Sequence, residues 1–442
     1  MTDDTRDQPG PDPSFIDLTP GDLPRIKDLE DMVWFDVQPG GTPADLEDDL
    51  DFTYARAVLR AGGPLPGEPE DGAVPLAGMY SAYPMTLTLP GPDDGPPAVV
   101  PMSGLTWVGV HTDSRRQGLL TRMIRDHLHR VRADGEAAVS GLQASEPGIY
   151  GRFGYGHAST DVKLELGRGT TFRAPVDIDE AAGAVQTHVV TLPTPEGMAA
   201  LHEAHLACAA TTVGTVTRPA DKAQVWFRDL PTSRGRKEPR RLMLARRDGT
   251  ITGYAVFRRE PRWEDGTPKG TVDVPEMGAA DRPSLLALAR RLVNLDLTSR
   301  VDLWGRAPDD PLLWWAGGPR SASPKTIDSL WVRLVDLPRA LTERGYAAAC
   351  DLVLEVTDEL CDWNAGRWRL TVDAVGRATC TRTEDEADLV VPVAALGAAY
   401  LGGRSVASLA PVLGLTEHRP GAVRALSRAM RGDIDPVGAI GF

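Results

Sequence analysis

The chain has 442 residues, of which 42% are hydrophobic and 25% are charged, and this composition is typical of soluble globular proteins with large cores. Its formal net charge of −14 argues against nucleic-acid binding, because phosphate backbones require a basic face, and favours cationic small molecules as partners. The longest apolar run, residues 389–403, is shorter than the roughly 20 residues of a membrane-spanning helix, so no membrane partner is expected.

Two features predict a cytoplasmic protein. Residues 1–14, MTDDTRDQPGPDPS, are acidic and have no apolar core, so they do not resemble a signal peptide and we expect them to be disordered. The cysteines have neither C-x-x-C nor metal-ligand spacing, which predicts buried free thiols and no metal site; they are Cys208, Cys350, Cys361 and Cys380.

The first part of the chain predicts alternating helices and strands. Residues 19–34 predict a helix that Thr19 or Asp22 caps. Its apolar face consists of Leu23, Ile26, Leu29 and Met32. A loop, two strand regions, an amphipathic helix, a buried strand and a short turn or helix follow at residues 61–73, 75–90, 105–111, 116–135, 137–145 and 149–156. This order is typical of an α/β layered domain, which we place at residues 15–170.

A similar order of elements recurs in residues 171–328. A helix precedes a hairpin with Asp248-Gly249 at its turn, and a strand, a helix and a strand follow. We interpret this region as a degenerate second copy of the first domain. Its strand-to-helix junction, residues 274–286, offers no glycine–arginine cradle for a phosphate, so we expect no cofactor there. The helix carries His202 and His205, which we expect on a solvated face.

The pattern changes again near residue 329. Residues 329–442 alternate short strands with helices, which predicts a third, α+β domain. The chain ends in GDIDPVGAIGF, an apolar tail whose last residue is Phe442. Chain ends usually fray, but an apolar end predicts docking against the rest of the protein.

The junction VGVHTDSRRQGLLTRMI, residues 108–124, has the features of an anion site. The free N–H groups of a helix's first turn attract an anion, and Gly118 permits close approach of a ligand. Arg115 and Arg116 add charge-assisted hydrogen bonds. The preceding strand offers backbone groups to an extended arm. A strand, an R-x-x-G turn and a helix therefore suit a pyrophosphate joined to a peptide-like chain, which describes coenzyme A.

Three stretches together resemble a known family. The first, residues 104–124, resembles the Q/R-x-x-G-x-G/A cofactor loop of GNAT acetyltransferases, although Leu120 stands where a small residue is usual. With LQASEPGIYGRFGYGHAS at residues 142–159 and a terminal phenylalanine, the chain is similar to the Eis (enhanced intracellular survival) family of aminoglycoside N-acetyltransferases. The resemblance implies an α/β (α+β) fold with an N-terminal GNAT domain, a second degenerate GNAT-like domain without cofactor, and a sterol-carrier-like C-terminal domain.

The resemblance also implies site residues for the donor, acetyl-CoA. The pantetheine arm would bond the backbone of Val108, Gly109 and Val110. The pyrophosphate would lie in a cradle of Arg115, Arg116, Gln117, Gly118, Leu119, Leu120 and Thr121. Ser145 and Glu146 would contact the cofactor near its reactive end. Tyr150 would be the general acid and the terminal carboxylate of Phe442, on a tail that reaches the active site, the general base; a homo-hexamer is implied as well.

The sequence gives less direct evidence for the acceptor site. A cationic polyamine needs carboxylates and aromatic faces, and MVWFD closes the first predicted helix, where GNAT folds place acceptor contacts. We therefore expect Trp34, Phe35 and Asp36 to bind substrate. The penultimate residue, Gly441, adds no side-chain carboxylate beside the terminal one.

Ordinary structural interpretations stand beside these roles. The two arginines of the cradle could mark a charged first turn without a ligand. Tyr150 could pack beside Phe153 and Tyr155, and Trp34 and Phe35 could pack in the core.

Three functions remain open from the sequence. The first is acetyl transfer from acetyl-CoA to aminoglycoside-like polyamines at one or more positions. The second keeps the chemistry but takes protein lysines or other small amines as acceptors. The third is lipid binding by the C-terminal domain, with the GNAT core as a scaffold.

Overall fold

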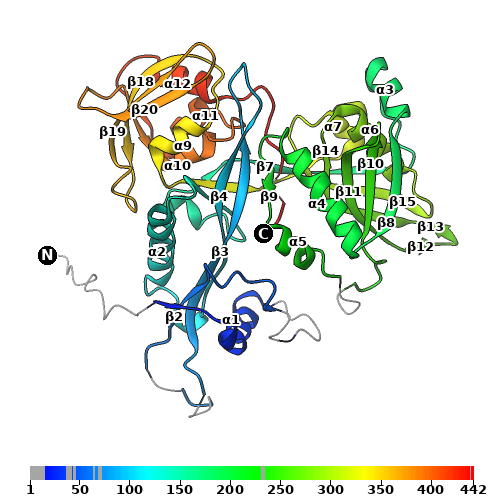
Figure 1. The fold of residues 1–442 in the computed structure, drawn as a ribbon, viewed down its shortest axis with the longest axis horizontal. Coiled ribbons are helices and arrows are strands. Elements are labelled where there is room, and N and C mark those ends of the chain that lie inside the picture. The colour runs from blue at the N-terminus through cyan, green and yellow to red at the C-terminus, as the bar shows by residue number, and fades with distance from the viewer. Residues whose placement is uncertain are drawn as a thin grey trace. The chain divides into compact units, whose positions relative to one another are not determined.

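The computed structural model describes residues 15–35, 42, 46–62, 65–67, 72–229, 234–438 and 440–442. The segment expected to be disordered, residues 1–14, and the predicted acceptor residue Asp36 lie outside them. Within this part of the chain the strands form sheets of eight, seven and five strands and a two-stranded ribbon, accompanied by helices (Figure 1). The expected α/β (α+β) fold class is confirmed. None of the described helices combines the length and apolar content of a transmembrane segment.

The chain divides into two compact units. The small unit comprises residues 1–83 and 105–126, and the large unit comprises residues 84–104 and 127–442. Two long strands and one helix run through both units.

The first sheet has the order β1-β2-β3-β4-β5-β17-β6. Its strands are β1 (Phe15–Asp17), β2 (Arg56–Leu59), β3 (Leu76–Leu89), β4 (Ala98–Val110), β5 (Val139–Gln143), β17 (Leu330–Leu334) and β6 (Gly156–His157), and β9 (Val216–Thr217) pairs with β3. β4 and β5 are parallel, and their pairing runs from Met102–Val139 to Gly104–Gly141. The last residues of β4 extend beyond that pairing.

Helix α1 (Leu23–Trp34) ends at the predicted residue but begins four residues later than predicted. Thr19 forms a capping box with Asp22, but this box closes a separate 3-10 turn before α1. Leu23, Ile26 and Leu29 are buried as expected, and the last two pack against Leu76 and Met79 of β3. Met32, which was expected on the same apolar face, is instead 49% exposed.

Helix α2 (Leu119–Asp134) follows the predicted amphipathic pattern. Its buried side includes Met123, Ile124, Leu128 and Val131. Gly135 takes the left-handed conformation just past the last helical residue, as a C-terminal glycine does.

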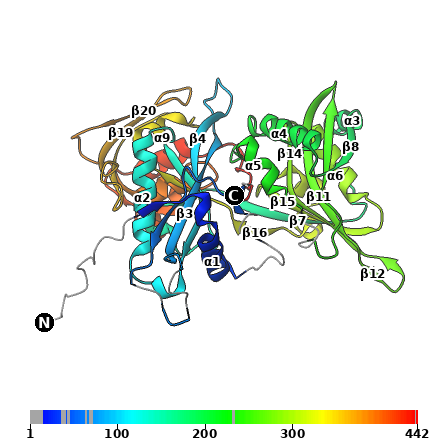
Figure 2. The same cartoon turned by 60° about the horizontal axis from the view of Figure 1, so that its bottom comes forward.

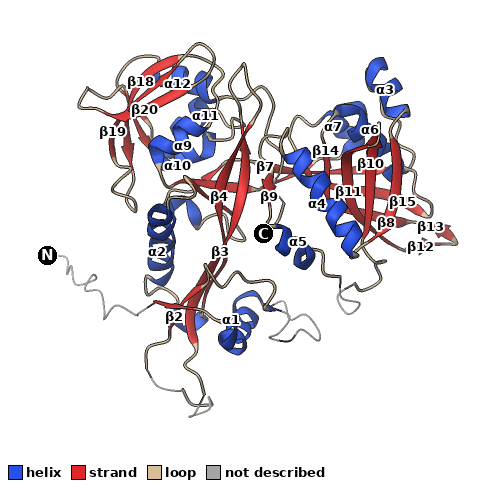
Figure 3. Cartoon of the chain, in the orientation of Figure 1, coloured by secondary structure: helices blue, strands red, loops and turns tan. Residues whose placement is uncertain are grey.

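The second sheet has the order β16-β7-β15-β14-β11-β10-β8. Its strands are β16 (Lys325–Asp328), β7 (Thr160–Gly167), β15 (Thr298–Arg306), β14 (Gly270–Ala279), β11 (Thr250–Glu260), β10 (Arg241–Arg247) and β8 (Gln186–Thr191). Its helices are α3 (Val176–Gly183), α4 (Pro195–Ala209), α5 (Ala220–Trp226), α6 (Arg282–Val293), α7 (Pro311–Trp315) and α8 (Pro319–Ala322) (Figure 3). Asp248 and Gly249 form the predicted hairpin turn, both with positive φ. Figure 2 shows a short ribbon, β12 (Trp263–Glu264) and β13 (Thr267–Pro268), projecting from one end of this sheet.

The third sheet has the order β20-β19-β18-β21-β22. Its strands are β20 (Ala378–Arg382), β19 (Gly366–Val372), β18 (Cys350–Thr357), β21 (Leu389–Pro392) and β22 (Thr416–Glu417). Its helices are α9 (Leu337–Glu343), α10 (Val393–Ala399), α11 (Val406–Leu413) and α12 (Ala422–Met430). This is the α+β pattern expected for the C-terminal region.

Two strands pair outside the domain to which we assigned them. β17, expected to open the third domain after residue 329, pairs with β5 and β6 of the first sheet. β7, expected to close the first domain before residue 170, pairs with β15 and β16 of the second sheet. Alternation along a strand says which side chains face a core, but the pairing partner depends on distant residues.

Candidate active site

The end of β4 presents backbone that departs from a regular strand. Trp107 has a φ of +54°, in the left-handed region, and its indole N–H donates to the Tyr83 hydroxyl over 3.0 Å. A left-handed residue inside a strand locally re-aims the backbone that follows, as in a β-bulge. The following residues are Val108, Gly109 and Val110. Gly109 is also approached closely by Val33 of α1, which leaves no room there for a side chain.

The predicted cradle lies between β4 and α2 in the small unit. Arg116 has a φ of +62° and Gly118 a φ of +74°, and a Cβ built on Gly118 would have no heavy atom within 4 Å. The first helical hydrogen bond runs from the Arg122 N–H to the Gly118 carbonyl, over 3.2 Å. The N–H groups of Leu119, Leu120 and Thr121 therefore belong to the open end of the helix.

The side chains of the cradle match this arrangement. Arg115 and Arg116 are exposed, and the amide of Gln117 donates to the Asp113 carbonyl over 3.1 Å. Leu119 is buried with Val58 and anchors the start of α2, so it can offer only its backbone N–H. An open, electropositive cradle beside two exposed arginines fits a pyrophosphate.

Tyr150 lies in the large unit, in the 3-10 turn η4 (Tyr150–Phe153). Its ring meets the edge of Tyr155, with centroids 6.0 Å apart and planes at 74°. Burial raises the pKa of the Tyr150 phenol above 10, and the nearby Glu146 carboxylate raises it further. The phenol is therefore protonated at neutral pH. Ser145 and Glu146 are exposed in the loop after β5.

The C-terminal tail is docked in the large unit. The Val437 N–H donates to the Val213 carbonyl over 3.1 Å, and the Gln143 side chain donates to the Ile440 carbonyl over the same distance. The Phe442 ring lies against Gly104 of β4, where an added Cβ would come within 3.0 Å of it. The tail therefore ends against the paired portions of β4 and β5.

The predicted acceptor residues are mostly exposed. Trp34 is 41% exposed and Phe35, in a left-handed conformation, is 85% exposed, so Phe35 does not pack in the core. Beside them is a residue that the sequence analysis missed. Burial raises the pKa of Glu30 to about 7 although Trp34 donates a hydrogen bond to it. Its Oε1 has no hydrogen-bond partner among the described residues, and the four-residue spacing from Trp34 was the available clue.

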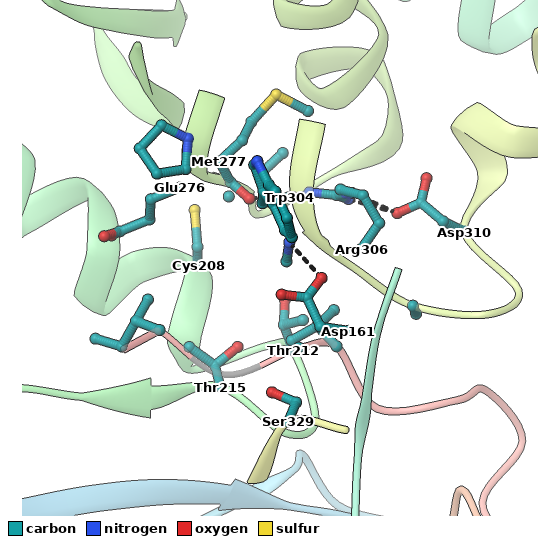
Figure 4. A pocket seen from close by; sticks show the side chains of 18 of the residues that line it. Asp161, Cys208, Thr212, Thr215, Glu276, Met277, Trp304, Arg306, Asp310 and Ser329 are labelled. Carbon is teal, nitrogen blue, oxygen red and sulfur yellow. Dashed lines mark hydrogen bonds and ion pairs between the residues drawn. The ribbon is translucent and has the colours of Figure 1, made fainter. Parts of the chain in front are cut away.

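A cavity of about 920 Å³ lies in the large unit. Its walls include the end of β5, the ends of β14 and β15, the loop after α4, and the C-terminal tail with Gly441. Figure 4 shows Asp161 near the middle of the view, with a dashed hydrogen bond to the backbone, and the Arg306–Asp310 pair at one side. Apolar groups such as Trp304 and Met277 complete the lining.

Three carboxylates at this cavity form no ion pair within the described part of the chain: Asp161, Asp309 and Asp328. Asp161 accepts from the Gly305 N–H over 2.8 Å, and Asp328 accepts from the Trp331 indole over 2.7 Å. Burial raises the pKa of Asp161, and the Gly305 hydrogen bond opposes this shift. The cavity can therefore receive positive charge.

The junction of β14 and α6 differs from the cradle. The Asp281 carboxylate accepts from the Ser284 N–H over 2.8 Å and so occupies the helix N-terminus. Arg306 reaches from β15 to the Met277 carbonyl over 2.9 Å and ties the two strand ends together. The helix end at this junction is therefore covered by a carboxylate of the chain itself.

His205 corrects one expectation. We expected it on a solvated helix face, but it is 2% exposed and bonds Tyr254 over 2.7 Å. Tyr254 donates to Glu276, which also pairs with Arg218. The helix spacing did not reveal this cluster, because burial of α4 on β11 depends on tertiary packing.

Comparisons with known proteins cover all three regions. Residues 70–158 and 214–334 each match a family model of an acetyltransferase (GNAT) domain, and residues 337–437 match a sterol carrier protein domain. An uncharacterized N-acetyltransferase of Streptomyces coelicolor is 37% identical over 90% of this chain and 93% of its own length. The N-acetyltransferase Eis of Mycobacterium tuberculosis is 32% identical over 82% of this chain and 86% of its own.

Solved structures agree with these matches. Eis1 from Mycobacterium abscessus superimposes with a TM-score of 0.77 and 27% identity, covering 97% of this chain and 100% of its own. A GCN5-related N-acetyltransferase from Anabaena variabilis gives a TM-score of 0.77 at 18% identity, covering 97% of this chain and 99% of its own, and supports the fold alone.

Proposed function

The chain belongs to the Eis family of GNAT N-acetyltransferases, and we propose that its acceptor is a cationic polyamine of the aminoglycoside type, acetylated at one or more amines. The enzyme takes its acetyl group from acetyl-CoA. The observation that carries the proposal is the cavity beside the C-terminal tail with its three carboxylates, Asp161, Asp309 and Asp328, that pair with no cation in the described structure.

The cradle supplies the proposed donor contacts. The N–H groups at the start of α2, with Arg115 and Arg116, would hold the pyrophosphate, and Gly118 leaves room for it. The backbone of Val108 to Val110 would bond the pantetheine arm, and Ser145 and Glu146 would contact it near the thioester. The open end of α2 and the exposure of Ser145 and Glu146 support these roles.

Acetyl transfer requires one proton to leave and one to arrive. The free amine forms a bond to the thioester carbonyl carbon, the carbon–sulfur bond breaks, and the sulfur leaves with its electron pair. Tyr150 would donate its proton to that sulfur, for which its raised pKa keeps it protonated. The new amide nitrogen would lose its proton to water or to the terminal carboxylate.

The terminal carboxylate of Phe442 suits an electrostatic role. An α-carboxylate has an ordinary pKa of about 3.5, which makes it a weak base toward an ammonium group. Held by the docked tail, it would position the acceptor's cation or a bridging water, and much of the rate would come from orientation.

The acceptor is expected to bind through its ammonium groups and through contacts with aromatic side chains. Carboxylates of the cavity would bind several ammonium groups. Trp34, Phe35 and Asp36 remain the aromatic and acidic residues that the sequence predicts for acceptor binding. A hexamer is proposed on the family resemblance, and light scattering of the purified protein tests it.

An assay of thiol release tests the acceptor class. With acetyl-CoA we expect an aminoglycoside to give a far lower KM than a lysine-containing peptide or a neutral monoamine, and that KM to rise with salt. The double substitution Asp161→Asn and Asp328→Asn keeps both hydrogen-bond acceptors and should raise the aminoglycoside KM about 10-fold with little change in kcat.

Asp296→Asn is the matched control, because Asp296 is an exposed carboxylate of the same sheet region that lies outside the cavity. An equal rise in KM with Asp296→Asn would show that the carboxylates of the cavity do not bind the acceptor. Absence of thiol release with every amine would overturn the acetyltransferase assignment to small acceptors.

A further inference from the structure

The turn that carries Tyr150 is held by a fully buried arginine from another part of the chain. Arg333 of β17 is 0% exposed, and its Nε–H donates to the carbonyl of Phe153, the last residue of η4, over 2.9 Å. A second N–H group of Arg333 donates to the Leu334 carbonyl over 2.7 Å. The guanidinium therefore ties the end of the turn to the neighbouring strand.

The rest of that guanidinium faces the C-terminal domain. Its Nη2 donates to both oxygens of Asp358, over 2.6 and 2.8 Å, and Asp358 follows β18 of the third sheet. Asp358 in turn accepts from the backbone N–H of Cys361 over 3.0 Å and from the side chain of Asn364 over 3.2 Å. Because the guanidinium is planar and rigid and all three of its nitrogens have partners, the position of Asp358 helps to determine where Nε points.

Two glycines bring the same domain against the turn. A Cβ on Gly156 would lie 2.1 Å from the backbone of α10, at Ala394 and Ala398. A Cβ on Gly154 would lie 2.7 Å from the Arg333 Nε. The segment after Tyr150 is therefore packed backbone to backbone on a helix of the sterol-carrier-like domain.

We propose that Arg333 and Asp358 are positioning residues for the general acid, through which the sterol-carrier-like domain sets the place of the Tyr150 phenol. The proposal rests on the proposed role of Tyr150 and goes beyond it, since it gives the C-terminal domain a part in the chemistry separate from its tail. A buried ion pair seldom adds net stability over well-packed apolar residues, so a purely structural role explains this pair poorly. Neither residue touches the reacting atoms.

A double-mutant cycle on kcat tests the proposal. Tyr150→Phe removes the acid and should lower kcat about 10²- to 10⁴-fold. The paired substitution Arg333→Met with Asp358→Asn removes both charges but leaves an acceptor for the Cys361 N–H, so the protein should fold. It should lower kcat at least about 10-fold, with the acetyl-CoA dissociation constant unchanged, because the phenol is held less well.

The combination of all three substitutions is decisive. If Arg333 and Asp358 act through Tyr150, the combined variant should have the kcat of Tyr150→Phe within about 2-fold. Thermal unfolding shows whether each variant is folded. If the paired variant is not, Arg333→Lys repeats the cycle, because it keeps a cation beside Asp358 but loses the Nε–H bond to the Phe153 carbonyl.

A matched pair elsewhere provides the control. Outside the cavity, Arg419 also donates to a backbone carbonyl, that of Asp351, and to a carboxylate, Asp388, which accepts from the Val353 N–H as well. Any effect of Arg419→Met with Asp388→Asn on kcat should multiply with that of Tyr150→Phe. If the Arg333 and Asp358 effects multiply in the same way, or leave kcat unchanged, the positioning role is overturned and the acid role stands. If Tyr150→Phe itself leaves kcat unchanged, the acid role fails and this inference fails with it.

Discussion

The junctions from β4 to α2 and from β14 to α6 occupy matching places in two related layers. Each follows a strand that pairs in parallel with the next one, β4 with β5 and β14 with β15. In the first junction Gly118 leaves the helix end open between two exposed arginines. In the second, Asp281 covers the helix end with its own carboxylate and pairs with Arg247 over 3.0 Å.

This difference shows how one side chain changes what the end of a helix can accept. The N-terminus of a helix favours any negative charge, whether it belongs to a ligand or to a capping side chain. Asp281 supplies that charge in the second junction, whereas the first junction leaves its helix end open. The second difference is the hydrogen bond from Arg306 to the Met277 carbonyl. It joins the ends of β14 and β15 at the place where the pantetheine arm of a donor would have to enter.

The largest effect is expected at the C-terminus, whose tail passes the second sheet but ends on β4 and β5. Deletion of Phe442 removes the native terminal carboxylate and the ring packed on Gly104. We expect kcat to fall at least about 100-fold with acetyl-CoA binding preserved, as measured by steady-state kinetics and calorimetry. Phe442→Ala keeps a carboxylate on the last residue and should lose less. Full activity of the truncated enzyme would exclude the terminus from the reaction.

The next largest effect comes from making the first junction resemble the second. Gly118→Asp introduces a carboxylate at the helix end and a side chain at a φ of +74°. The dissociation constant of acetyl-CoA should rise about 30- to 100-fold, through charge repulsion and backbone strain. Gly118→Asn has nearly the same shape without the charge and should cost about 10-fold or less. Equal losses would mean that charge at this helix end is irrelevant.

The two layers also differ in their buried acids. The pKa of Glu30 is raised to about 7 by burial, whereas Arg218 and His205 depress the pKa of Glu276 despite its burial. Ionisation of Glu30 therefore lowers the free energy of unfolding progressively as pH rises from about 4.5 to 7. Glu30→Gln should raise stability by at most about 3 kcal/mol at pH 8 and leave it unchanged near pH 4.

The substitution Glu276→Gln is expected to change stability in the opposite direction to Glu30→Gln. Its depressed pKa contributes stability that is present above the unfolded value and is lost as pH falls, so the substitution should destabilise the protein at pH 8. Denaturant unfolding at both pH values measures the two effects. A loss of stability from Glu30→Gln at pH 8 would contradict the raised pKa.

The smallest effect is expected from opening the second junction. Asp281→Ala removes the cap of α6 and should cost about 1 kcal/mol, seen as a lower Tm. Calorimetry should still find a single acetyl-CoA site per chain, because the Arg306 link remains. A second donor site in this variant would show that the cap alone had closed the cleft.

Local features of the site were predictable from the sequence. The spacing of Met123, Ile124 and Leu128 determines the buried face of α2, and the glycine at 118 determines where that helix can begin. The Asp248-Gly249 turn and the apolar tail are equally local. Each depends on backbone preferences and on side chains a few residues apart, which a single stretch of sequence contains.

Only the tertiary structure decides which strands pair and which side chains contact one another. β17 joins the first sheet and thereby brings Arg333 to the Phe153 carbonyl, although no pattern in the strand indicates either. The burial of His205 and the hydrogen bond from the Gly305 N–H to Asp161 depend on elements far away in the chain. Pairing and burial are set by long-range packing, in which each residue's environment is supplied by others, so they become readable only once the chain is folded.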